Sequence, residues 1–370
     1  MNYCKKCVIP DTRPGSIFDD EGVCPACRNH ERRSSVNWQA RREELQALCD
    51  KHRRSDGYYD CIIAVSGGKD SHFLTYMMTE EMGMNPLVMT VGDPFTKTAA
   101  GVHNLNNLSE AFGRDRLLFN FSTGLFRKVT RIATEQLGEP LRFIEAAINI
   151  LPTKYACALG IPLVVFGEDG AYEYGNTDVE NYSALDWMIE YAERIDVEFW
   201  LDNGVRRDEI NGLIPPTPEE IQRSGLEPFF MSYFVPWDGR RHWEISKRFG
   251  FRDLAHEWRR EGNIEDYDQV DSVAYIVHSW MKYPKFGFAR ATDIACRWIR
   301  GGRISREKAK KLVMEYDHKL DQKAMDDFNQ FMGYTTRQFW DIVERFWNPE
   351  LFEKDGVLWK LKDPVYEDLL

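Results

Sequence analysis

The chain contains 370 residues, of which 43% are hydrophobic, enough to bury the core of one large domain or of two smaller ones. Its 48 basic and 59 acidic residues give a formal net charge of −11, which excludes a general electrostatic attraction to nucleic acid. No apolar run is as long as a membrane span, and the first residues do not resemble a secretory signal. We therefore expect a cytoplasmic protein that does not bind membranes, with nucleic acid an unexpected partner.

Four of the eight cysteines lie near the start of the chain as two C-x2-C pairs. Cys4 and Cys7 are followed, after sixteen residues, by Cys24 and Cys27, a spacing typical of a four-thiolate zinc site. A redox motif or an iron–sulfur cluster remains open, because four thiolates alone do not select the metal. We expect structural zinc that folds residues 1–32 as a knuckle or ribbon.

Residues 33–57 are predicted to form a linker helix. The segment is basic and polar, and Trp38, Leu45 and Leu48 recur in it at helical spacing. Its arginines either touch RNA or form a solvated helix face, and we expect the second.

A strand-to-helix turn with the sequence Ser-Gly-Gly-Lys-Asp-Ser follows. Residues 61–65 form a short apolar run typical of a buried strand, and apolar residues after the turn recur at helical spacing as far as Gly83. Gly67 and Gly68 allow the backbone to come close to a ligand, and the helix start attracts phosphate. The spacing excludes both a Walker loop and a dinucleotide-binding turn.

The polar side chains of this turn suit a nucleotide phosphate. Ser66 and Ser71 offer hydroxyl groups and Lys69 offers a cation. Asp70 would repel phosphate unless it holds a metal ion that bridges the oxygens, so we expect it to bind magnesium.

The hexapeptide resembles the PP-loop of the ATP pyrophosphatases, a group that includes asparagine and GMP synthetases, NAD synthetase and tRNA-thiolating enzymes. The resemblance implies that Mg²⁺-ATP is cleaved between its α and β phosphates and that a substrate oxygen is adenylated. A nitrogen or sulfur nucleophile then displaces AMP. The resemblance implies catalytic roles for Lys69 and Asp70. Lys154 is expected to open the helix before the apolar run at 162–169, where the resemblance implies that it steadies pyrophosphate, unless it is a surface lysine.

Apolar runs at 85–92, 116–122 and 162–169 alternate with helix-like segments after the loop. This alternation predicts an α/β fold with a doubly wound parallel sheet in residues 58–200, and the PP-loop resemblance implies the same. Ligands of such sheets lie beyond the carboxyl ends of the strands, where Ser122 also falls. Glu168 and Asp169 either bind magnesium or substrate there, or are solvated loop acids. The expected ATP site comprises Val65, Ser66, Gly67, Gly68, Lys69, Asp70, Ser71, Thr90, Glu168 and Asp169.

Residues 201–370 are predicted to be a mostly helical region for substrate or partner. A capping box at 217–221 predicts a helix start, and 229–238 is interpreted as an added strand or a lid. A basic cluster in this region consists of Lys282, Lys285 and Arg290. It is expected either to bind an anion, which would be an acidic sugar or a nucleotide diphosphate, or to form a solvated loop.

The order of the motifs along the chain resembles the N-acetyl sugar amidotransferases. The cysteine pairs and the PP-loop are followed by "HNLNNL" (103–108), "GEDGAYEYG" (167–175) and the segment 283–317. The resemblance extends from Cys4 to about Asp317. It implies conversion of an acetamido group on a sugar into an acetamidino group, in bacterial surface-polysaccharide or nonulosonic-acid synthesis.

This reaction needs ammonia, and the chain shows no evident glutaminase domain. The resemblance implies a separate glutaminase subunit, alone or together with a cyclase-like barrel subunit. The alternative function is sulfur transfer to tRNA, in which Cys157 would be a catalytic thiol or a cluster ligand. The acidic chain and the lack of a further C-x2-C pair after residue 27 speak against it.

Overall fold

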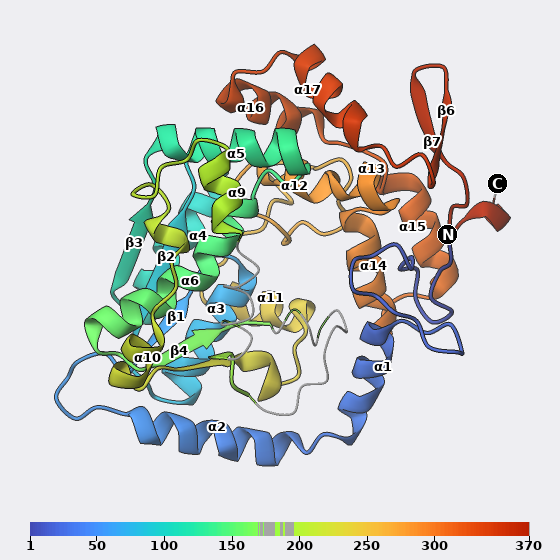
Figure 1. Ribbon diagram of the computed structural model, residues 1–370. Coiled ribbons are helices and arrows are strands. Elements are labelled where there is room, and N and C mark those ends of the chain that lie inside the picture. Colours follow the sequence, from blue (N-terminus) through green and yellow to red (C-terminus); the bar gives the residue numbers. More distant parts are fainter. Residues whose placement is uncertain (169, 171–172, 174–181, 186–187, 189–195, 370) are drawn as a thin grey trace.

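The computed structural model describes residues 1–168, 170, 173, 182–185, 188 and 196–369 (Figure 1). At its centre is a parallel sheet of five strands in the order β3-β2-β1-β4-β5. The strands are β1 (Cys61–Ala64), β2 (Pro86–Gly92), β3 (Arg116–Asn120), β4 (Leu163–Phe166) and β5 (Glu227–Phe230). The predicted α/β class with a parallel sheet is confirmed.

Helices cover both faces of this sheet, as a doubly wound arrangement requires. Ile62 and Ile63 of β1 point to opposite faces and both are fully buried. Ile63 lies in an apolar cluster with Phe73 of α3, and Ile62 lies in another with Val129 of α5. A strand buried on both faces reads as a continuous apolar run. The helices around the sheet are α2 (Trp38–His52), α3 (Lys69–Tyr76), α4 (Ala99–Phe112), α5 (Thr123–Leu137), α6 (Arg142–Leu159), α9 (Val197–Asp202) and α10 (Pro218–Ser224).

The fifth strand corrects the predicted extent of the sheet. The sheet was expected within residues 58–200, but β5 lies beyond that segment and pairs in parallel with β4. Pro228 in β5 cannot donate to a neighbouring strand, which suits the edge position of β5. Of the two interpretations of 229–238, the added strand is the correct one for Phe229 and Phe230. The predicted capping box at Thr217 is present and starts α10.

The remainder of the chain is mostly helical and packs beside the sheet (Figure 1). It comprises α11 (Gly239–Arg248), α12 (Tyr275–Trp280), α13 (Lys282–Phe286), α14 (Arg290–Arg300), α15 (Arg306–Tyr316), α16 (Gln322–Met332), α17 (Thr336–Val343) and the hairpin of β6 (Phe352–Asp355) and β7 (Leu358–Leu361). No helix in the described part of the chain is long and apolar enough to cross a membrane.

The cysteine-rich segment packs against these C-terminal helices. Val8 and Val23 share an apolar cluster with Ala295 of α14 and Ala309 of α15. The helix α1 (Pro25–Arg32) leads from this segment towards the sheet, and the two ends of the chain lie close together (Figure 1). The first thirty residues therefore form part of one body with the C-terminal region.

A buried carboxyl group fixes the start of α14. Asp317 is 3% exposed and accepts hydrogen bonds from the backbone N–H groups of Ala289 (2.8 Å) and Thr292 (2.9 Å). The hydroxyl of Thr292 donates a third bond at 2.7 Å. Asp317 thus satisfies N–H groups that the first turn of the helix leaves unpaired, and it sets the position of α14.

We predict that Asp317→Ala lowers the free energy of unfolding by about 2 kcal/mol, because buried donors lose their acceptor. The measurement is urea unfolding followed by circular dichroism. Asp341→Ala is the control, since Asp341 is exposed on α17 and pairs with Arg337 only at 3.8 Å. An equal urea midpoint for the two variants would contradict this account of α14.

Candidate active site

The PP-loop between β1 and α3 is closed on itself by its two serines. The backbone N–H of Ser66 donates to Ser71 Oγ at 2.9 Å, and the N–H of Gly68 donates to Ser66 Oγ at 3.3 Å. Gly68 is the residue before the first turn of α3 and brings no side chain to cap it. The start of α3 can therefore receive an anion, as the sequence predicts for phosphate.

Gly67 is required by the neighbouring helix. Its φ is +95°, and a Cβ at this position would lie 3.0 Å from Leu105 Cα on α4. At Gly68 a Cβ would meet only Ser66 Oγ, at 3.4 Å. Both glycines were expected to make room for a ligand. The structure shows that Gly67 is also required because a side chain there would collide with α4.

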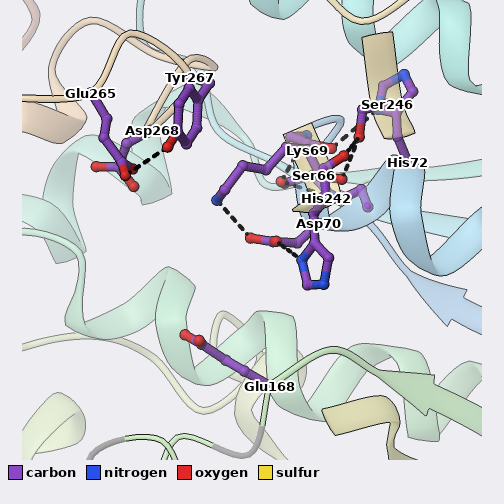
Figure 2. A network of polar contacts seen from close by, with 12 residues as sticks. Ser66, Lys69, Asp70, His72, Glu168, His242, Ser246, Glu265, Tyr267 and Asp268 are labelled. Atoms are coloured by element: carbon purple, nitrogen blue, oxygen red, sulfur yellow. Dashed lines mark hydrogen bonds and ion pairs between the residues drawn. The ribbon is translucent and has the colours of Figure 1, made fainter. Parts of the chain in front are cut away.

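Asp70 and Lys69 lie next to each other at the start of α3 (Figure 2). Lys69 Nζ is 2.9 Å from Asp70 Oδ2, and His242 Nδ1 of α11 is 2.7 Å from Asp70 Oδ1. Burial favours a higher pKa for Asp70, but Lys69 and then His242 outweigh it and hold the pKa well below its usual range. The side chain of Asp70 is 40% exposed, so this carboxylate is ionised and reaches solvent.

Sequence reasoning did not identify His242. This residue is 172 positions away from Asp70 in the chain and belongs to no motif quoted above. The start of α11 could have been located from the sequence, because Asp238 precedes a helical pattern and aspartate often caps a helix. In the structure its side chain accepts from Arg241 N at 2.8 Å. Nothing in the sequence shows which helix α11 packs against.

A cavity of about 620 Å³, open to solvent, adjoins Lys69 and Asp70. Three parts of the chain form it: the PP-loop side of the sheet, the segment that follows the cysteine knuckle, and the C-terminal region. The lining residues outside the loop include His30, Arg33, Glu168, Trp237, Glu265, Arg297, Arg300 and Arg303. Of the predicted site residues, the structure brings Lys69, Asp70 and Glu168 together here.

Acidic and basic side chains alternate around this cavity. Glu168 follows β4, lines the cavity and lies 3.5 Å from Arg297 of α14. Across the cavity, Glu265 accepts from Tyr267 at 2.8 Å and from Trp298 Nε1 at 2.5 Å (Figure 2). Asp169, the other acid predicted here, lies outside the described residues, as does most of the motif 167–175.

Thr90 has the properties of a ligand-binding residue. It lies near the carboxyl end of β2 and is 4% exposed. Its buried hydroxyl has no hydrogen-bond partner among the described residues, and a buried hydroxyl without a partner costs free energy. Thr90 does not line the cavity beside the PP-loop, so its role in binding ATP stays a prediction. Ser122, by contrast, caps α5 by accepting from Leu125 N at 3.3 Å.

Lys154 differs from its prediction. We expected it to open the helix before β4, but it lies inside α6, well after the helix start at Arg142. Its Nζ donates to the carbonyl of Asn211 at 2.8 Å, and it does not line the cavity beside the PP-loop. Proline is common in the first turn of a helix, so Pro152 indicated a helix start in this segment. In the structure Pro152 lies within α6.

The three basic residues of the C-terminal region that were predicted to bind an anion are in ion pairs. Lys282 pairs with Asp293, and Lys285 Nζ lies 2.9 Å from Glu139. Arg290 donates to Asp268 at 2.8 Å. Neither predicted alternative, a substrate site or a solvated loop, describes them, because all three join elements within the protein. The next three arginines along the chain, Arg297, Arg300 and Arg303, do line the cavity.

The four cysteines of the two C-x2-C pairs converge on one point. Their sulfur atoms all lie within 4.8 Å of one another, with 4.0 Å between Cys4 and Cys27 and 3.7 Å between Cys7 and Cys24. A single tetrahedral zinc ion with bonds of about 2.3 Å holds its sulfurs about 3.8 Å apart. A four-iron cluster holds its thiolates farther apart. The set therefore fits one zinc ion.

Magnesium has a more limited set of ligands here. Asp70 is the carboxylate at the PP-loop, and its two oxygens face Lys69 and His242. Magnesium is usually held by one or two carboxylates together with substrate phosphates and water. Asp70 fits that arrangement once phosphate attracts Lys69, and a bound ion would there neutralise charge on the phosphates.

We predict that the purified protein contains one zinc per chain by elemental analysis, and that Cys24→Ser loses the metal and unfolds at lower temperature. A structural zinc site contributes directly to folding, because its ligands come together only in the folded state. Cys49→Ser is the control, since Cys49 is equally buried but lies apart from the four. Iron and sulfide in place of zinc would contradict this assignment.

We predict that Gly67→Ala reduces ATP affinity at least about tenfold, because a side chain is strained at this φ and collides with α4. Gly113→Ala is the matched control: it also has a positive φ, but a Cβ there meets nothing within 4 Å. Calorimetric titration with ATP and magnesium measures both. Equal affinities would show that the contact with Leu105 does not shape the loop.

Comparison with known proteins gives a family match and more distant similarities. Residues 261–365 match the family described as LPS biosynthesis protein WbpG-like, C-terminal domain. An uncharacterised protein of Methanocaldococcus jannaschii is 27% identical over 118 residues, which are 32% of this chain and 42% of that protein. The chain thus spans less than half the length of this relative.

Two solved structures align with much of the chain at low similarity. A U34-tRNA thiolase from Methanococcus maripaludis, with its [4Fe-4S] cluster, is 13% identical with a TM-score of 0.33, covering 87% of this chain and 90% of that one. An NH3-dependent NAD synthetase from Campylobacter jejuni is 17% identical with a TM-score of 0.29, covering 58% and 97%. The family match supports the resemblance drawn from the motifs: residues 261–365 are similar to the C-terminal domain of the WbpG-like LPS biosynthesis proteins, and they follow a parallel sheet with a PP-loop sequence.

Proposed function

We propose that the protein is an ATP-dependent, AMP-forming amidotransferase of bacterial surface glycan biosynthesis. It converts the acetamido group of an N-acetylated sugar into an acetamidino group. The observation that carries this proposal is the shared cavity. Lys69 and Asp70 of the PP-loop line it on one side, and Arg297 and Arg303 of the WbpG-like segment line it on the other. A nucleotide and a glycan acceptor can thus meet in one place.

The first step activates a poor electrophile. The acetamido oxygen attacks the α phosphorus of ATP, the bond to the bridging oxygen breaks, and pyrophosphate leaves. The start of α3 and the Lys69 ammonium stabilise the negative charge that develops on the leaving pyrophosphate. Burial favours a lower pKa for Lys69, but Asp70 and Asp268 outweigh it and raise the pKa, so this lysine is charged.

The second step replaces AMP by nitrogen. Ammonia attacks the carbon of the adenylated acetamido group, loses a proton, and AMP leaves with the original amide oxygen. Because the product is an amidine, the sugar gains a basic group. We propose that the ammonia comes from a separate glutaminase subunit, alone or with a barrel-shaped subunit, as the resemblance implies.

The alternative, sulfur transfer to tRNA with Cys157 as a catalytic thiol, is not favoured by the surroundings of Cys157. Its sulfur lies 3.2 Å from Ser224 Oγ on the α6 side of the sheet, and burial raises its pKa. A raised pKa disfavours the thiolate, which is the reactive form. Cys157 also does not line the cavity beside the PP-loop.

The test of the proposed reaction is mass spectrometry of mixtures that contain the protein, magnesium-ATP, an ammonium salt and a panel of N-acetylated nucleotide sugars and nonulosonic acids. We expect one acceptor to lose the mass difference between an oxygen atom and an NH group, with equal amounts of AMP and pyrophosphate. Sulfur appearing in added tRNA, with every sugar unchanged, would contradict the proposal.

We predict that Asp70→Ala lowers the rate of AMP formation at least about 100-fold while the fold survives, because the charge that organises the phosphates is lost. The thermal unfolding midpoint should stay within a few degrees of that of the wild type. Asp56→Ala is the control, since Asp56 is an exposed loop residue paired with Arg54. An active Asp70→Ala enzyme would rule out the role of this carboxylate.

A further inference from the structure

We propose that His242 is a positioning residue for Asp70, holding the carboxylate so that one oxygen faces the cavity. This inference rests on the proposed function, since it names a residue that acts on the same ATP site. It goes beyond the PP-loop motif, because His242 comes from α11, a helix between the sheet and the WbpG-like segment.

The contacts of His242 fix which ring nitrogen carries the proton. The backbone N–H of Asp238 points at Nε2 from 3.4 Å, so Nε2 accepts. Nδ1 lies 2.7 Å from Asp70 Oδ1. A neutral imidazole with an accepting Nε2 has its proton on Nδ1, and that proton is donated to Asp70.

The ring cannot turn away from this position. His242 is 0% exposed and stacks on Phe73 of α3, with centroids 3.9 Å apart and planes inclined by 13°. Trp237 packs edge-on against its other side at 4.4 Å. A ring turned out of this plane would lose the stacking, and a ring flipped by 180° within it would place carbon atoms where the two nitrogens form their hydrogen bonds.

The helix α11 is itself attached to the PP-loop. The hydroxyl of Ser246, one turn after His242, lies 2.8 Å from the carbonyl oxygen of Lys69 and 2.6 Å from that of His242, so it joins α11 to the loop. At the end of α11, Asn107 from the motif 103–108 donates to the carbonyl of Phe249 at 2.5 Å. At its start, Asp238 pairs with Arg303 of the WbpG-like segment. Three parts of the protein thus hold the imidazole in place.

The consequence concerns the second oxygen of Asp70. Because His242 engages Oδ1, Oδ2 is directed at Lys69 and the cavity, as Figure 2 shows. Phosphates in the cavity would compete for Lys69 and leave Oδ2 for a metal ion. Hydrogen bonds to a ligating group from outside the metal sphere commonly change metal affinity or activity by about 10- to 100-fold.

Two substitutions separate the hydrogen bond from the packing. His242→Phe keeps a ring against Phe73 but removes the donor. His242→Asn removes the ring but keeps an N–H group close to the position of Nδ1. His52→Phe is the control, because His52 also bonds a carboxylate, Glu227 at 2.6 Å, far from the cavity. The readouts are kcat for AMP formation, KM for ATP, and the magnesium concentration that gives half the maximal rate.

We expect His242→Phe to lower kcat about 10- to 100-fold and to raise the magnesium requirement, with KM for ATP within about threefold of wild type. His242→Asn should recover most of kcat, and His52→Phe should equal wild type. Full activity of His242→Phe would overturn the proposal. So would equal losses in both variants, because packing alone would then explain them.

A spectroscopic measurement tests whether His242 donates its Nδ1 proton to Asp70, and it does so even if the proposed reaction is wrong. In protein labelled with ¹⁵N-histidine, NMR should show His242 with its proton on Nδ1, and Asp70→Ala should shift that proton resonance. A wild type that forms no AMP would contradict the proposed function and leave this result intact. A proton on Nε2, or no response to Asp70→Ala, would overturn the positioning role.

Discussion

The carboxylate of Asp70, held between a lysine and a buried histidine, is the interaction around which the candidate site is built. β1 delivers the loop to the edge of the sheet, Gly67 allows it to turn beside α4, and α3 presents Lys69 and Asp70 together. His242 adds a hydrogen bond to this carboxylate from a helix far along the chain. The site therefore has one fixed cation and one fixed anion, which suits a reaction in which negative charge moves from one phosphate to another.

The cysteine knuckle also contributes to this site, although it was expected only to fold the first residues. α1 begins directly after Cys24, and the segment from α1 onwards brings His30 and Arg33 to the cavity. Arg306 donates to the carbonyl of Cys7 at 2.9 Å, which ties the knuckle to α15. A metal ion that folds this segment therefore also sets one wall of the cavity, and its loss should affect acceptor binding as well as stability.

The sequence predicted those features that are determined by residues close together in the chain. The parallel sheet followed from apolar runs, the PP-loop from one hexapeptide, and the cysteine site from spacing, since neighbouring residues determine each of these. Contacts across the chain were not predictable. His242 reaches Asp70 from 172 residues away, and the ion pairs of Lys282 and Arg290 have partners that no spacing indicates. The fifth strand lies beyond the segment expected to hold the sheet, because β5 follows β4 by about sixty residues and no local pattern shows that the two strands pair.

The central claim is that ATP activates the oxygen of an acetamido group. The most direct measurement uses an acceptor whose acetamido oxygen is ¹⁸O, with AMP analysed by mass spectrometry after a single turnover. The account predicts that the label moves to the phosphate of AMP, because that oxygen becomes the bridge between carbon and phosphorus and leaves with AMP. Unlabelled AMP formed together with an amidine product would contradict it, since the amide oxygen would then have left by another route.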